Sequence, residues 1–470
     1  MSHQVPTNVD ASRAVEGLGY RSPLRRALGA VITVGIAVGC VSPIAATFIN
    51  VPVLISSLGT YLLPEYIISA VIALALAYIY SELGSIYPLA GGLYSVGLKV
   101  LGKPMGFMTL LVYLVQAVFI PAVVALGAAT YANLLVPAIP VVAWAIIFMA
   151  LSGLLAISGI RASGLSAFVF VGIEAAVLIV LTVAGLAHIQ QGTSLFANTA
   201  VIGKTVGPVG FGAVLGAVAI GLFGYNGFDS ALNFSEETLG SSRQIGLGAV
   251  RAATIVIILE ILPIVGMLLA VPATALIHSQ NPINLFGTTV LGNAGVTIIE
   301  IGAVIAIFNA TLTEVMQFSR ILYASGRDQA WPAAISRSLA YVWPSSGTPV
   351  VSIAVVVVLG IILDIFSSLA NSITFIGVDL VFLYLIVAIA TVVSRFRDRS
   401  LERPYRMPIW PVMVLVSLAG SIIVLTQQTP GEILSMLAIL AAGLIYYALY
   451  LARKPDWGAG DIKAMARERE

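Results

Sequence analysis

The chain has 470 residues, of which 59% are hydrophobic and only 9% are charged, and its mean hydropathy is +1.03. This composition excludes a water-soluble protein of such length and predicts a membrane protein with many transmembrane helices. The single cysteine excludes an internal disulfide, and three scattered histidines indicate no metal site. The net charge of +2 is uninformative as a total, and nothing in the sequence indicates a nucleic-acid partner. We expect no cleavable signal, because residues 1–27 are polar.

Hydropathy predicts an all-α membrane protein with twelve transmembrane helices. The predicted spans are, in chain order, 28–56, 62–84, 104–132, 139–158, 164–188, 209–235, 248–271, 293–323, 349–368, 371–395, 408–427 and 432–452. Residues 28–452 therefore form the membrane domain, between the tails 1–27 and 453–470. With both tails in the cytoplasm, every Lys and Arg except Lys204 falls in or beside a cytoplasmic segment. The positive-inside rule thus predicts a multi-pass protein of the cytoplasmic membrane with both termini inside.

The first span is too long for one straight helix and is interrupted at Val41-Ser42-Pro43. A proline inside a helix removes one hydrogen bond and clashes with the preceding turn. We expect a break here; the alternative is an ordinary proline kink.

The sixth span is interrupted at Gly224-Tyr225-Asn226-Gly227 and followed by Asp229, after which we expect helix again up to Glu236-Glu237. Each glycine disfavours continuous helix by about 1 kcal/mol. Interrupted backbone in a bilayer persists only where protein buries it or where it lines an aqueous cavity. An ionisable residue beside such a break is a functional-site candidate, and the alternative is a packing pair of glycines with a snorkelling acid. Breaks in corresponding spans of two halves indicate inverted repeats around a central site.

Three blocks of sequence resemble the amino acid–polyamine–organocation superfamily of secondary transporters. They are ELGSIYPLAGGLYSVGLKVLG after span two, FGYNGFDSALNFSEETLGSSRQIGLGAVRA at span six and SRILYASGRDQAWP after span eight. The resemblance covers roughly residues 25–452. It implies the leucine-transporter-type fold, with inverted five-helix repeats over about 28–188 and 209–395 and two C-terminal helices over about 408–452. It also implies alternating access to a substrate held between the breaks in spans one and six.

The first break departs from the family pattern. Members that bind α-amino acids usually carry Gly-Ser-Gly there, and its free N–H groups hold the substrate carboxylate at a half-helix N-terminus. Val41-Ser42-Pro43 stands in its place, and proline offers no N–H while valine crowds the approach. We therefore expect weakened carboxylate capture at this break.

The family blocks also imply roles for single residues. Phe223 falls at the aromatic gate over the substrate, and Asp229 at a position linked to proton coupling or to cationic substrates. Glu314 and Gln116 fall at substrate-facing positions of spans eight and three. The remaining predicted substrate contacts are Val41, Ser42, Pro43, Ala45, Gly224, Tyr225, Gly227 and Ala310.

Glu174 is the ionisable residue of span five. By resemblance it falls where some proton-coupled relatives have a lysine, which occupies the site that sodium fills in sodium-driven members. A carboxylate there can bind a proton or help to bind Na⁺, with Asn309, Thr311 and Thr313 as further coupling residues. The alternative is a structural acid satisfied by hydroxyl groups of span eight. Glu260 and Glu300 match no family site, and we expect them to make polar contacts near a vestibule or between helices.

We therefore expect a secondary active transporter for an amino acid, an organic amine or a polyamine, coupled to protons. A cationic substrate is favoured because Asp229, Glu314 and Glu174 converge while the carboxylate cradle is degraded. A neutral amino acid permease or an exchanger is the alternative, and a passive channel is a more remote one. An enzyme is disfavoured, since the sequence has no His/Cys cluster, nucleophile motif or phosphate loop. We expect a small-molecule substrate and the lipid bilayer as partners, no cofactor and no obligate protein partner.

Overall fold

The computed structural model describes residues 26–192, 201–202, 205–206, 210–367, 369–454 and 457–458, together with Val15, Glu16, Leu18 and Leu24. Helices dominate this part of the chain, which confirms the expected all-α membrane protein. Seven helical stretches among the described residues are long and apolar enough to cross a membrane, and four shorter apolar helices accompany them. Lys204 and most of both predicted tails lie outside the described residues.

The N-terminal half begins with a broken helix. Its elements are, in order, α2 (Ala30–Val41), α3 (Pro43–Ala45), a π-helical turn (Ala46–Asn50), α4 (Val51–Leu58), a 3-10 turn (Gly59–Tyr61), α5 (Leu62–Ile86), α6 (Gly92–Val100), α7 (Lys103–Leu135), α8 (Val141–Ile157) and α9 (Ile160–Ala187). The stretch from α2 to α4 is called the first broken helix below.

Two short antiparallel strands of two residues each, β1 (Val201–Ile202) and β2 (Thr205–Val206), precede the C-terminal half. Its elements are α11 (Phe211–Gly224), α12 (Ser230–Asn233), α13 (Ser242–Ala270), α14 (Ala273–His278), α15 (Pro282–Arg327), α16 (Ala333–Leu339), α17 (Val350–Phe366), α18 (Leu369–Arg397), α19 (Trp410–Thr426), α20 (Pro430–Leu449) and a 3-10 turn (Leu451–Arg453). Together α11 and α12 are called the second broken helix.

A left-handed residue breaks the first broken helix. Ser42 has φ 51° and ends α2, and Pro43 opens α3, where its missing N–H and fixed φ suit a first helical position. The Ser42 hydroxyl accepts a hydrogen bond from the Ala45 N–H at 3.3 Å. The chain therefore starts a second helix here, and the interruption is more than a proline kink.

The second broken helix resumes for only one turn, so the expected helix up to Glu236-Glu237 is wrong. α12 ends at Asn233, and residues 234–237 form turns. Turn bonds between residues three apart replace the helical pattern here, from the Ser235 N–H to the Leu232 carbonyl at 3.1 Å and from the Glu237 N–H to the Phe234 carbonyl at 3.0 Å. The chain then contacts the start of the first broken helix, where the Leu28 N–H donates to the Glu237 carbonyl at 3.1 Å.

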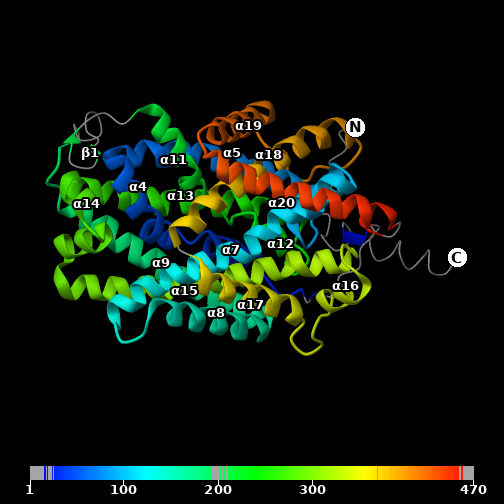
Figure 1. The fold of residues 1–470 in the computed structure, drawn as a ribbon, viewed down its shortest axis with the longest axis horizontal. Helices are drawn as coiled ribbons and strands as arrows, with labels where there is room; N and C mark the ends of the chain where they lie inside the picture. Colours follow the sequence, from blue (N-terminus) through cyan, green and yellow to red (C-terminus); the bar gives the residue numbers. More distant parts are fainter. Residues whose placement is uncertain are drawn as a thin grey trace, which may run out of the picture.

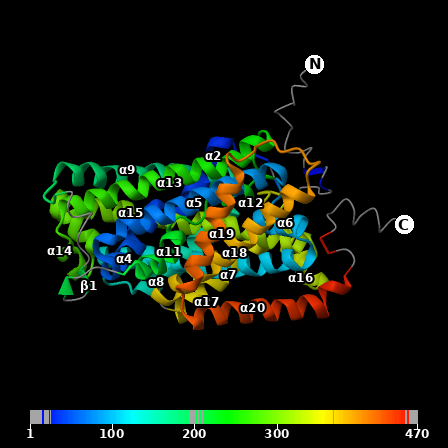
Figure 2. The ribbon, with the colours of Figure 1, turned by 90° about the horizontal axis from the view of Figure 1, so that it is seen from above.

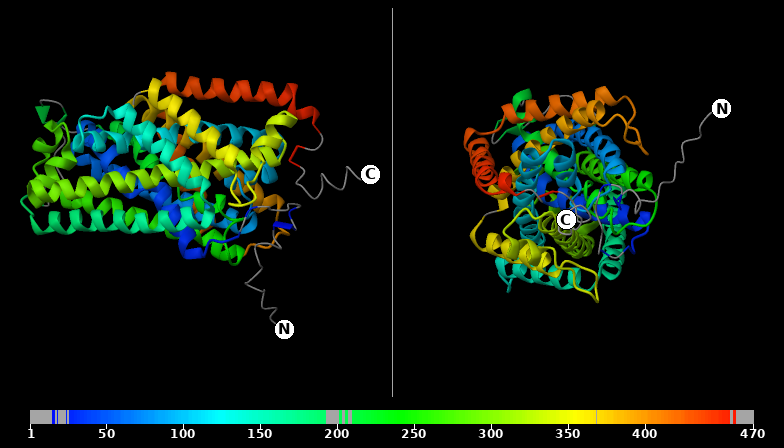
Figure 3. Two further views of the ribbon diagram at one scale, coloured as in Figure 1. Left: turned by 90° about the horizontal axis from the view of Figure 1, so that it is seen from below. Right: turned by 90° about the vertical axis from the view of Figure 1, so that its right-hand side faces the viewer.

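Most helices run along one direction of the molecule (Figure 1). α6 and α16 lie near one end of the bundle, and α14 and β1 lie near the other (Figure 2). α19 and α20 lie on the outside, as the end-on view shows (Figure 3). Only Met436 and Gly443 of α20 are buried, which agrees with that outer position. The breaks themselves, at Ser42 and at residues 224–229, are buried inside the bundle.

Candidate functional site

The two breaks face each other. Gly227, in the second break, has φ +119°, which favours glycine. A Cβ atom at this position would lie 2.8 Å from the carbonyl carbon of Cys40 and 2.8 Å from the nitrogen of Val41. Glycine therefore allows the two interrupted backbones to touch near the middle of the bundle.

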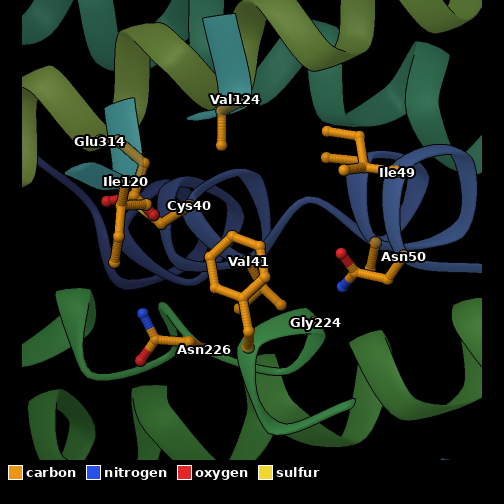
Figure 4. A pocket seen from close by; sticks show the side chains of 12 residues that line it. Cys40, Val41, Ile49, Asn50, Ile120, Val124, Gly224, Asn226 and Glu314 are labelled. Atoms are coloured by element: carbon orange, nitrogen blue, oxygen red, sulfur yellow. The ribbon is translucent and has the colours of Figure 1, made fainter. Parts of the chain in front are cut away.

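A cavity of about 20 Å³ lies between the breaks. Glu314 and Asn226 lie at one end of it and Asn50 at the other, with apolar side chains between them (Figure 4). The full lining is Cys40, Val41, Ala45, Ala46, Ile49, Asn50, Ile120, Val124, Phe223, Gly224, Asn226 and Glu314. This volume admits about one water molecule, so the surrounding helices must part before a larger solute can enter.

Five residues predicted to contact substrate line this cavity: Val41, Ala45, Phe223, Gly224 and Glu314. The other residues predicted to contact substrate are not part of this lining and interact with other parts of the protein. Gly227 contacts the Cys40–Val41 backbone, as described above, and Ala310 is buried within α15.

Tyr225 turns away from the cavity. Its ring packs edge-on against Tyr66 of α5, with the ring centroids 5.8 Å apart, and its hydroxyl donates to the Tyr66 carbonyl at 3.4 Å. Tyr225 therefore joins the second break to α5 and does not face the cavity.

Asp229 and Gln116 each bind a polar side chain that sequence reasoning missed. The Tyr113 hydroxyl donates to Asp229 Oδ2 at 2.6 Å, and Gln116 Nε2 donates to Asp379 Oδ2 at 2.9 Å. Asp379 lies in α18 within the apolar run FIGVDLVFLY, is fully buried, and has no hydrogen bond to Oδ1 within the described chain. A lone acid in such a run is the signal that could have found it.

Glu174 closes the start of α3. Its Oε1 accepts hydrogen bonds from the Ser42 hydroxyl and from the Ile44 N–H, both at 2.8 Å. Ser42 and Pro43 therefore lie against an acid of the protein itself. The Ile44 N–H at this helix start is thus bound to the side chain of Glu174.

The span-eight residues predicted to assist Glu174 bind elsewhere. The Thr311 hydroxyl donates to the Ile307 carbonyl at 3.4 Å, and the Thr313 hydroxyl donates to the Asn309 carbonyl at 3.0 Å. Asn309 Nδ2 donates to the Ala167 carbonyl at 3.4 Å. Asn309 and Thr313 instead pack against Gly39 of α2, where a Cβ atom would lie 3.0 Å from Asn309 Nδ2.

Buried ion pairs join elements near the bundle end that carries α6 and α16. Arg320 donates from Nε and Nη2 to the two carboxylate oxygens of Glu237, at 2.9 and 3.0 Å, and both side chains are fully buried. Arg327 pairs with Glu236 at 2.7 Å, and Glu82 pairs with Arg395 and Arg403. The arginines of these ion pairs thus lie at this end of the bundle. Among the described residues, no ion pair involves an acid at the cavity.

The sequence profile of the amino acid permease family matches residues 27–450. The chain is 25% identical to the methylthioribose transporter of Bacillus subtilis (strain 168), over 91% of this chain and 94% of that protein. It is 24% identical to the branched-chain amino acid permease BcaP of the same organism, but there it spans only 51% of the relative's length. It is 23% identical to the b(0,+)-type amino acid transporter 1 of Mus musculus, over 80% of this chain and 78% of the relative.

Proposed function

The chain belongs to the amino acid permease family of the amino acid–polyamine–organocation superfamily, and from that premise we propose that it moves an organic amine or a cationic amino acid by secondary active transport. Members of this family and the relatives above are transporters, so the chain is a membrane transporter and not an enzyme. The proposed cycle is alternating access around the cavity between the two breaks.

One observation carries the choice of a cationic solute. Glu314 lines the cavity, and its Oε2 accepts no hydrogen bond within the described chain although the side chain is only 1% exposed. Asp229, in the turn before α12, and Asp379, in α18, are also buried. Each accepts a hydrogen bond from an uncharged side chain, Tyr113 and Gln116 respectively. A buried carboxylate is unfavourable without a partner, and a transported ammonium group is a partner that can leave again.

The break at Ser42 supports the same choice. The Ile44 N–H, which could receive a substrate carboxylate, is bound to Glu174 instead. An α-carboxylate entering from the cavity would meet this fixed acid and would have to displace it. We propose that Glu174 takes part in coupling transport to a proton, since it joins the first break to α9.

The proposed membrane arrangement has twelve spans in a domain of residues 28–452. Residues 28–188 and 209–395 form the two inverted repeats, and 408–452 the two peripheral spans. The end with α6 and α16 faces the cytoplasm, because it carries the buried ion pairs and the basic loops, and both tails lie on that side. The membrane is the cytoplasmic membrane.

A neutral amino acid is the second candidate. The mainly apolar lining contributed by Val41, Ile49 and Val124 favours it, as does a relative named for branched-chain amino acids. In that case Glu314 would bind the amino group of the substrate. The substrate carboxylate would need hydrogen-bond donors other than the Ile44 N–H.

The proposal is tested by solute uptake into proteoliposomes containing the purified full chain. Radiolabelled putrescine, arginine and alanine are offered with and without an imposed pH gradient, with protein-free vesicles as the blank. Uphill accumulation of putrescine or arginine above alanine is the expected result. Uptake that only equilibrates, with or without a gradient, would indicate a channel, and preferred accumulation of alanine would establish the neutral amino acid alternative.

A further inference from the structure

A second group of buried acids lies on the other side of the second broken helix. Glu65 of α5 and Glu260 of α13 are both fully buried. Glu65 Oε1 accepts a hydrogen bond from the Ser69 hydroxyl at 2.7 Å, but its Oε2 has no partner within the described chain. Neither carboxylate oxygen of Glu260 has a partner there. Glu260 is thus a buried acid with less hydrogen bonding than Glu174, which has two donors.

Both acids contact α11, the half-helix that ends at the break. A Cβ atom at Gly221 would overlap Glu65 Oε1, and a Cβ atom at Gly224 would lie 3.6 Å from Glu260 Oε2 and 3.0 Å from Asn50 Nδ2. The two glycines are three residues apart and therefore share one face of α11. Movement of α11 would change the surroundings of both acids together.

Asn50 connects this acid group to the cavity. Its side chain is 1% exposed, lines the cavity beside Gly224, and points toward it (Figure 4). Asn50 Nδ2 donates to the Ile220 carbonyl at 3.5 Å, and Oδ1 has no partner within the described chain. Asn50 and Glu260 thus both lie beside Gly224, and each has an acceptor oxygen without a donor within the described chain. This place is therefore suited to bind a group that donates hydrogen bonds.

The titratable side chains that face Glu260 are all acids or phenols. Glu65 and Tyr66 face it from α5, Glu174 from α9 and Tyr225 from the second break, and these acids and phenols supply no positive charge. Several buried carboxylates this close cannot all be ionised. Among the described residues, no three acid, His or Cys side chains converge as a metal site. A single buried carboxyl group of this kind can be neutralised by one proton.

We propose that Glu260 binds the proton that drives transport, with Glu65 as the neighbouring acid and Asn50 as the link to the cavity. This inference rests on the proposed transport function. When α11 moves and water reaches Glu260, the carboxyl group loses its proton to that water. When the cavity opens to the other side, the carboxylate takes a proton from water there. Glu174, which keeps its two donors at the first break, takes part in coupling as a second acid that can hold a proton.

The first test does not depend on transport. Infrared spectra of the purified full chain in lipid vesicles at neutral pH are recorded for wild type, Glu260→Gln and Glu402→Gln. Glu402 is exposed, so its replacement is a matched control for loss of an acid. We expect Glu260→Gln to remove part of the C=O stretching band of protonated carboxylic acids and Glu402→Gln to leave it unchanged. An unchanged band in Glu260→Gln overturns the proposal. If sodium chloride removes the band of the wild-type protein and choline chloride does not, Na⁺ displaces the proton from the acid. This outcome would also overturn the proposal.

The second test is transport of putrescine and alanine into proteoliposomes under an inward gradient of about one pH unit, which drives about tenfold accumulation per coupled proton. We expect Glu260→Gln to lower gradient-driven uptake to the wild-type level without a gradient, while exchange of labelled for unlabelled solute continues. Continued exchange shows that the variant folds. Gradient-driven uptake that survives in this variant would overturn the coupling role. If wild type transports neither solute while the infrared band is lost in the variant, the proposed substrates fail and the proton site stands.

Discussion

The carboxylate of Glu174 lies 2.8 Å from the backbone nitrogen of Ile44, at the start of the helical segment that follows the first break. An anion at a helix start is stabilised by the free N–H groups and by the helix dipole. Here that anion comes from α9, 130 residues away in the chain. The N–H of Ile44 is therefore already bound to an acid of the protein itself.

Glu174→Gln is expected to abolish uphill uptake while downhill exchange continues in part. Glutamine keeps an oxygen that can accept from Ile44 and Ser42, but it carries no charge and takes up no proton. The measurement is accumulation of labelled solute under an imposed proton or sodium gradient, with Glu402→Gln as the control. Accumulation equal to that of wild type would refute a coupling role for Glu174.

Glu314→Gln is expected to weaken binding of putrescine and arginine about fivefold and to leave alanine nearly unchanged. Opposite charges ~4 Å apart attract by about 4 kcal/mol at an effective dielectric near 20. If a quarter of this survives desolvation, the preference is roughly fivefold, since 1.4 kcal/mol is a factor of ten. Competition binding to the purified wild type and variant measures it. If alanine binds best to both proteins, the substrate is not cationic.

Gly227→Ala is expected to abolish transport and to lower the thermal unfolding midpoint. Its φ of +119° disfavours alanine, and the new Cβ would overlap the Cys40–Val41 backbone. Gly292→Ala is the matched control, because Gly292 has φ +72° with no atom within 4 Å of its built Cβ. The control should show only the conformational strain, about 1–3 kcal/mol, because Gly292 has φ 72° and ψ 177°, a region essentially confined to glycine. Equal effects of the two substitutions would show that the contact between the breaks is unimportant.

Arg320→Met is expected to destabilise the protein by about 3–5 kcal/mol, because it leaves the Glu237 carboxylate buried without a partner. The double variant Arg320→Met/Glu237→Gln should regain much of this loss. Arg397→Met is the comparison, since Arg397 is 52% exposed in its pair with Asp398 and should cost only about 0–1 kcal/mol. Thermal unfolding in detergent reports the differences. A double variant no more stable than Arg320→Met would contradict the unpaired-charge explanation.

The features that could be predicted from the sequence are those that depend on the backbone preferences of single residues. Pro43 and the glycines at 224 and 227 disfavour continuous helix wherever they occur, so both breaks were accessible to sequence reasoning. The end of α12 at Asn233 was not, because residues 234–238 contain neither proline nor glycine to mark it. The contact of Gln116 with Asp379 joins residues 263 positions apart, and periodicity contains no information about such a pairing. The same holds for the two glycines of α11 that contact Glu65 and Glu260.

Cys40 is the single cysteine of the chain, and it lines the cavity between the breaks. The protein therefore carries a native chemical reporter at its centre. A small membrane-impermeant thiol reagent added to one face of the vesicles can modify Cys40 only in molecules whose cavity is open to that face. The labelling rates from the two faces measure how the population divides between outward-open and inward-open states. A solute that slows labelling from both faces has entered the cavity, so unlabelled compounds can be screened without any engineered cysteine.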